Sequence, residues 1–171
     1  MHYLTVCTLG AVLAFPGLAP AKAAAALDGF NGTWLLRREK STNHQPVVAE
    51  RKVVTIDATR LGVDYHGTGD VEHVFYPLDG SESVEKRGEG GPVTLTIRRR
   101  LTLRDAGNTP ILRTEIRVGA AGPADAIVMT ETWKLIEGGT LLREEHDDVQ
   151  DGKTEHRILV YQREGSDRDG T

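Results

Sequence analysis

The longest regular pattern in the chain is a strict alternation of apolar and polar positions over residues 93–104. A period of two held over this length is typical of a strand in an antiparallel sheet with one face against the core. The pattern therefore predicts a half-buried β-strand. Its apolar face carries Val93, Leu95, Ile97, Arg99, Leu101 and Leu103, and its polar face carries Thr94, Thr96, Arg98, Arg100, Thr102 and Arg104.

Residues 127–164 predict a three-stranded meander at the C-terminal end of the chain. Three extended runs are joined by a Gly-Gly pair at 138–139 and an Asp-Gly pair at 151–152. Such pairs supply the positive φ that two-residue primed turns require, so each predicts a β-hairpin. We expect the last strand, residues 157–163, to return and pair beside Trp34.

Shorter extended runs separated by turn signals fill the rest of the chain, and no convincing helical period is present. A meander of nine or ten strands must either close or expose its edges. The pattern therefore predicts an all-β fold, a single antiparallel up-and-down β-barrel of 8–10 strands. A sandwich is the alternative, but it usually needs longer crossing connections. The remaining predicted strands are 34–38, 51–59, 63–66, 71–78, 81–87 and 111–118.

Composition indicates the class of protein but not its activity. At 171 residues, 39% hydrophobic and 27% charged, the chain suits one globular domain and is too apolar for general disorder. Its formal net charge of −4 argues against a nucleic-acid partner, which usually demands a large basic face.

The first 25 residues predict a secretory signal peptide. An apolar run at 4–18 is followed by small residues that offer Ala-x-Ala sites, with cleavage expected near Ala24–Ala26. A retained membrane anchor is the alternative, but Pro16 and Pro20 interrupt a run that is short of the roughly 20 residues a span needs. The protein is therefore expected to be periplasmic or secreted, with no membrane span after cleavage.

The predicted mature part is a barrel domain over residues 26–164 and a disordered tail over 165–171. Its only potential thiol is lost, because Cys7 lies in the leader. The mature domain is therefore expected to have no disulfide, no thiolate metal site and no cysteine nucleophile.

Gly32-Thr33-Trp34 resembles the Gly-x-Trp signature of lipocalins and the wider calycin superfamily. The layout of the late segment is similar to that of bacterial secreted lipocalin-like proteins of unassigned function. The chain departs from lipocalins in having no disulfide and no Thr-Asp-Tyr motif, so eight-stranded and ten-stranded barrels both stay open. The resemblance implies a structural role for Trp34 at the closed end of the barrel, with Gly32 giving the chain its sharp entry.

Arg99 and Glu131 are the candidate ligand-binding charges. Each lies between two large apolar residues on a face predicted to point inward. A charge inside a barrel must be paired or solvated, so Arg99 is a candidate to bind a ligand carboxylate and Glu131 to orient it. The alternative is that both face outward or pair at the barrel mouth. Tyr65, Tyr76 and Trp133 are the aromatic candidates for lining a pocket, although core packing explains them equally well.

No catalytic residue, metal site or cofactor is predicted. No serine lies in a Gly-x-Ser-x-Gly elbow, and the acidic run 144–148 is interpreted as a solvated strand end rather than a calcium loop. His146 and His156 flank a predicted hairpin and are candidates for cross-strand neighbours, but two histidines make an incomplete metal site.

The sequence therefore favours a protein that binds a small, mostly apolar or amphipathic molecule in a barrel cavity. Two alternatives remain open: a small barrel enzyme that uses polar cavity residues, and a ligand-free structural or interaction protein of the cell envelope whose barrel is filled by side chains.

Overall fold

The computed structural model describes residues 20–42, 49–67, 69–91, 93–105, 109–119 and 126–166. Residues 1–19 of the predicted leader (1–25) and 167–171 of the predicted tail (165–171) lie outside the described residues, whereas residues 20–25 of the predicted leader belong to a short helix, α1 (Pro20–Leu27). The strands are β1 (Gly32–Leu36), β2 (Arg51–Ile56), β3 (Arg60–His66), β4 (Glu72–Pro77), β5 (Glu82–Arg87), β6 (Leu95–Arg104), β7 (Thr109–Val118), β8 (Ile127–Ile136), β9 (Leu141–Gln150) and β10 (Lys153–Arg163).

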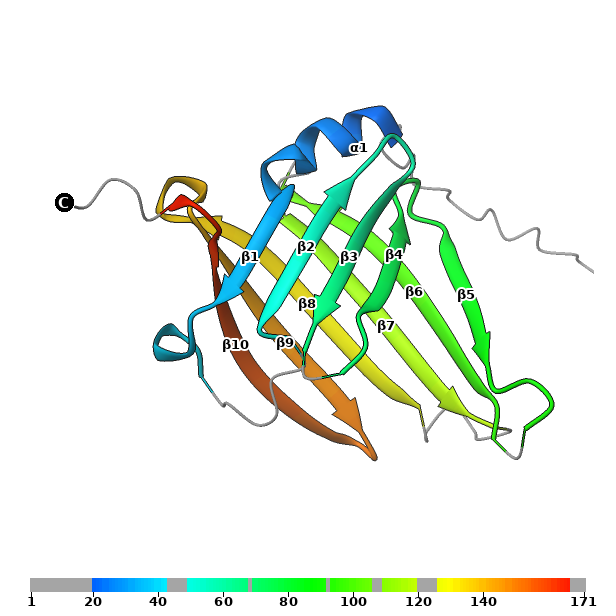
Figure 1. The fold of residues 1–171 in the computed structure, drawn as a ribbon. Helices are drawn as coiled ribbons and strands as arrows, with labels where there is room; N and C mark the ends of the chain where they lie inside the picture. The colour runs from blue at the N-terminus through cyan, green and yellow to red at the C-terminus, as the bar shows by residue number, and fades with distance from the viewer. Residues whose placement is uncertain are drawn as a thin grey trace, which may run out of the picture.

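The ten strands form one antiparallel sheet in the order β4-β3-β2-β1-β10-β9-β8-β7-β6-β5. Strands adjacent in the chain pair throughout, except that β4 and β5 do not, while β1 pairs with β10. The sheet therefore curls into a nearly closed up-and-down barrel, which confirms the predicted fold class (Figure 1). Trp34 lies opposite Arg163 in the ladder, as expected for the returning last strand.

Strand β6 follows the predicted alternation. Ile97, Arg99 and Leu101 are buried, while Arg98 and Arg100 between them are exposed. Successive side chains of a strand point to opposite faces, so the apolar face, Arg99 included, points into the barrel.

The two C-terminal hairpins differ in their turns. Between β9 and β10, Asp151 and Gly152 have φ values of 51° and 72°, the left-handed pair that a type I′ turn requires. Between β8 and β9 the hairpin is confirmed but the two-residue turn is wrong. The ladder ends at Ile136 opposite Leu141, and the connection includes a 3-10 turn, η5 (Glu137–Gly139).

One end of the barrel is covered by a helix that the pattern of the sequence did not predict. Helix α1 (Pro20–Leu27) and the 3-10 turn η1 (Asp28–Phe30) lie across this end (Figure 1). Alanine-rich α1 has high helix propensity but no polar face to produce an amphipathic period, and its stability comes from burial of Ala23 and Leu27. Among the described residues, no helix is long and apolar enough to span a membrane.

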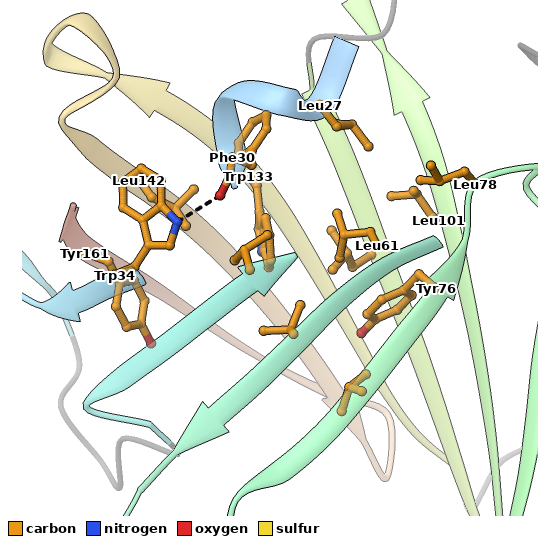
Figure 2. Close-up of a cluster of buried hydrophobic side chains, with 14 of the residues drawn as sticks. Leu27, Phe30, Trp34, Leu61, Tyr76, Leu78, Leu101, Trp133, Leu142 and Tyr161 are labelled. Carbon is orange, nitrogen blue, oxygen red and sulfur yellow. Dashed lines mark hydrogen bonds between the residues drawn. The ribbon is translucent and has the colours of Figure 1, made fainter. Parts of the chain in front are cut away.

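The closed end, defined here as the end under α1, contains the hydrophobic core. Trp34 is fully buried and its indole Nε1 donates to the Phe30 carbonyl at 2.9 Å (Figure 2). The Arg163 guanidinium lies over the Trp34 ring at 4.3 Å. Gly32 has φ 134°, and a Cβ there would lie 2.9 Å from Arg163 Nη1. Both residues thus have structural roles. Other core members are Leu27, Leu61, Leu78, Leu101, Trp133 and Leu142.

Leu27→Ala is expected to lower the free energy of unfolding by about 2–4 kcal/mol, because it leaves a cavity under α1 in a fully buried site. Urea denaturation of the variant measures this. Leu35→Ala on β1 is the matched control, since the Leu35 side chain is 38% exposed and should cost far less. Equal losses in the two variants would show that α1 does not contribute to the core.

Candidate functional site

A cavity of about 210 Å³ lies inside the barrel, on the far side of the closed-end core from α1. It is smaller than the roughly 300–1,000 Å³ of pockets for drug-sized ligands and has room on the order of seven water molecules. An occupant must therefore be small. The lining residues are Ala49, Lys52, Tyr65, Glu72, Val74, Tyr76, Arg87, Leu95, Ile97, Arg99, Thr114, Ile116, Met129, Glu131, His146, Arg157, Leu159 and Tyr161.

The ladder register explains why the polar lining residues meet. Residues opposite one another in antiparallel strands share a face of the sheet. Arg99 on β6 lies opposite Thr114 on β7. Glu131 on β8 lies opposite His146 on β9, which lies opposite Arg157 on β10. Because Arg99 and Glu131 both point inward, the residues opposite them in the ladder, Thr114, His146 and Arg157, point inward as well.

A fully buried ion pair lies between the cavity and the core. Lys52 Nζ donates to both carboxylate oxygens of Glu144, at 2.7 and 2.6 Å, and neither side chain is more than 1% exposed. Three aromatic rings surround the ammonium: the ring centroids of Tyr161, Tyr65 and Trp133 lie 4.3, 4.9 and 5.3 Å from Nζ. Cation–π attraction of this kind is strongest where the cation is desolvated.

The pair remains charged despite its burial. Burial by itself lowers the pKa of Lys52, but the nearby charges of Glu144 and Glu131 and the hydrogen bonds that Lys52 donates to Glu144 raise it above its ordinary value. Burial by itself raises the pKa of Glu144, but the Lys52 charge and the hydrogen bond from His146 lower it overall. Lys52 is therefore an ammonium at neutral pH and is not a nucleophile.

Arg99 lines the cavity and has a buried donor without a partner in the described part of the chain. Its side chain is 4% exposed, and Nη1 donates to Glu85 on β5 at 2.7 Å. Its Nε has no hydrogen-bond partner among the described residues. The same holds for Nε of Arg157, whose Nη2 lies 2.7 Å from Asp148. A buried donor left unpaired costs about 1–3 kcal/mol, so these groups favour an occupant that brings an acceptor.

Glu131 points into the same cavity and accepts a hydrogen bond from Trp133 Nε1 at 3.0 Å. The expected contact between Glu131 and Arg99 is not what the structure shows, since Arg99 pairs with Glu85 instead. Glu85 lies on the neighbouring strand β5 and reaches Arg99 beside the gap between β4 and β5.

Of the five residues predicted to bind a ligand, Arg99, Glu131, Tyr65 and Tyr76 line the cavity, and Trp133 does not. Trp133 is fully buried in the core and reaches the cavity only through its hydrogen bond to Glu131. The Tyr76 hydroxyl lies 3.0 Å from Thr114 Oγ1. Burial raises the pKa of Tyr65 and Tyr76 above the ordinary value, so both hydroxyls are protonated at neutral pH.

Sequence reasoning missed Lys52, Glu144 and His146. The interpretation of 144–148 as a solvated strand end is wrong for Glu144 and His146, which are 0% and 6% exposed. The available signal was the alternation itself, because buried Leu142 lies two and four residues before them on the same face. Lys52 likewise lies two residues before buried Val54.

Glu131, Glu144 and His146 bring one potential metal-ligand atom each to within 4.8 Å of one another. The Lys52 ammonium already binds both carboxylate oxygens of Glu144, so it occupies the place that a metal ion would take beside Glu144. His146 and His156 do not form a pair, because His156 is opposite Asp147 and binds it on the exposed outer face.

Comparison of the sequence with protein-family models and with curated proteins gives no match. Fold and site together define a nearly closed ten-stranded antiparallel barrel with a small interior cavity lined by apolar and charged side chains, an architecture compatible with a lipocalin-like fold.

Proposed function

We propose that this protein is a secreted or periplasmic lipocalin-like binding protein of bacteria that holds a small, mostly apolar molecule in its barrel cavity. The observation that carries the proposal is the Arg99 Nε donor, which is buried, unpaired among the described side chains and belongs to a residue that lines the cavity. An oxygen acceptor on the ligand satisfies this donor, while apolar residues contact the rest of the molecule. Those apolar lining residues are Val74, Leu95, Ile97, Ile116, Met129 and Leu159.

The two rival functions are separated from the proposal by polar groups rather than by cavity size. A ligand-free barrel predicts no cavity of ligand size, and the cavity of about 210 Å³ lies below the usual minimum of roughly 300 Å³, so the buried, unpaired Arg99 Nε is what favours a ligand. The enzyme alternative, with a histidine, Arg99 or Glu131 as acid, base or anion holder, has one feature in its favour: buried His146 lines the cavity, and its Nε2 lies 3.2 Å from a Glu144 carboxylate oxygen. Lys52 adds no nucleophile, because Glu144 holds it as an ammonium.

Titration of the ¹⁵N-labelled protein with 1-hexanol, followed by NMR, tests this proposal. We expect saturable shifts at cavity-lining residues and about a tenfold weaker dissociation constant in Arg99→Gln, because the unpaired donor is worth about 1–3 kcal/mol. Arg98→Gln is the matched control, since Arg98 is exposed and pairs with Glu82 on the outer face. Absence of saturable shifts in the wild type, or equal weakening in both variants, would contradict the proposal.

A further inference from the structure

Glu131 is the one cavity-lining charge without an ionic partner in the described part of the chain. The other charged lining groups belong to pairs or chains of opposite charge. Glu131 instead accepts from a neutral indole N–H. Lys52 pairs with Glu144, and Arg157 pairs with Asp148. Arg99, Glu85, Arg87 and Glu72 form a chain of alternating charge that runs from β6 through β5 to β4.

The carboxylate of Glu131, a cavity-lining residue, has acceptor positions left over. An ionised carboxylate has about four acceptor positions, and the Trp133 indole occupies one. Two of the three Lys52 donors go to Glu144, and no ion pair joins Lys52 to Glu131 among the described residues. Counted over Lys, Arg, Asp and Glu alone, the charged lining groups and their partners sum to a formal charge of −1, the charge of Glu131.

The charge of a bound ligand determines whether the net charge of the site moves toward zero or away from it. A carboxylate ligand adds a second negative charge to a site with restricted water, and a neutral ligand leaves the first one uncompensated. A protonated amine neutralises Glu131 and donates to its free oxygens through charge-assisted hydrogen bonds.

We infer that the ligand is a small organic amine whose ammonium group binds Glu131. This inference rests on the proposed function and changes the role expected for Arg99. The positive charge of Arg99 is already neutralised by Glu85, whose carboxylate lies 2.7 Å from Arg99 Nη1. The unpaired Nε of Arg99 therefore needs only a neutral oxygen acceptor, not a carboxylate. The ligand class is therefore an amine that also carries a hydroxyl, ether or carbonyl oxygen.

Calorimetric titration with three probes of one chain length tests the inference: n-hexylamine, 1-hexanol and hexanoate, at pH 8. At this pH an alkylamine is protonated, hexanoate is ionised and an ordinary histidine is neutral. The wild type should bind hexylamine at least tenfold more tightly than hexanol, and hexanoate most weakly. Glu131→Gln should remove the preference for the amine and leave hexanol binding within about twofold.

Glu145→Gln is the matched control, because Glu145 lies on the outer face of β9 and pairs with Arg143. It should keep the amine preference. Hexanoate binding as tightly as hexylamine, or an amine preference that survives Glu131→Gln, overturns the inference and leaves the proposed function standing. Failure of all three probes to bind the wild type overturns the proposed function and the inference with it.

Discussion

Lys52→Met is expected to lower the free energy of unfolding by about 3–5 kcal/mol, because it leaves Glu144 as an uncompensated charge in a fully buried site. Glu144→Leu should cost a similar amount by leaving the ammonium unpaired. The double variant should recover most of the loss, since replacing both partners of a buried pair by apolar groups is often close to neutral. Urea denaturation of the four proteins forms a double-mutant cycle. Losses that simply add in the double variant would contradict a direct pair.

The same pair predicts a pH window for stability. The folded-state pKa of Glu144 is lowered, so its contribution is present above about pH 4.5 and is lost as pH falls through the folded value. The folded-state pKa of Lys52 is raised, so its contribution is present below about pH 10.5 and is lost as pH rises further. The wild type should therefore lose stability relative to the double variant on both sides of this window.

Trp34→Ala is expected to cost about 3–5 kcal/mol, the range for truncating a fully buried tryptophan. The change removes the ring beneath Arg163 and leaves the Phe30 carbonyl without its donor. Trp34→Phe keeps an aromatic ring but not the N–H, so it should lose less, about 1–3 kcal/mol for the unpaired carbonyl.

Thermal or urea unfolding checks both Trp34 variants, and far-ultraviolet circular dichroism verifies that the barrel forms. A loss in Trp34→Ala no larger than that of the exposed-site control Leu35→Ala would contradict the role of Trp34 in closing the barrel.

The fold could be predicted because period-two alternation and turn residues are local signals. Strand β6 keeps its alternation over its full length, and this placed Arg99 inside the barrel before any pairing was known. Glu131 was found by the same reasoning. The Asp-Gly turn at 151–152 was equally local, since both residues supply the left-handed φ that the turn demands.

The centre of the site could not be predicted because it depends on distant partners. Lys52 and Glu144 are 92 residues apart and come from β2 and β9, which are not neighbours in the sheet. Lysine and glutamate usually lie on the solvated surface, so neither residue by itself indicates burial. Helix α1 was missed because residues 20–25, most of its length, were assigned to the predicted signal peptide and so left out of the barrel domain, whereas Ala23 and Leu27 are buried in the structure.

Native mass spectrometry of the protein purified from its own host tests the central claim most directly. The account predicts a species heavier than the chain by the mass of one small molecule, released on denaturation and reduced in Arg99→Gln. Recovery of the bare chain alone, together with no saturable binding of the hexyl probes, would contradict a ligand-binding barrel.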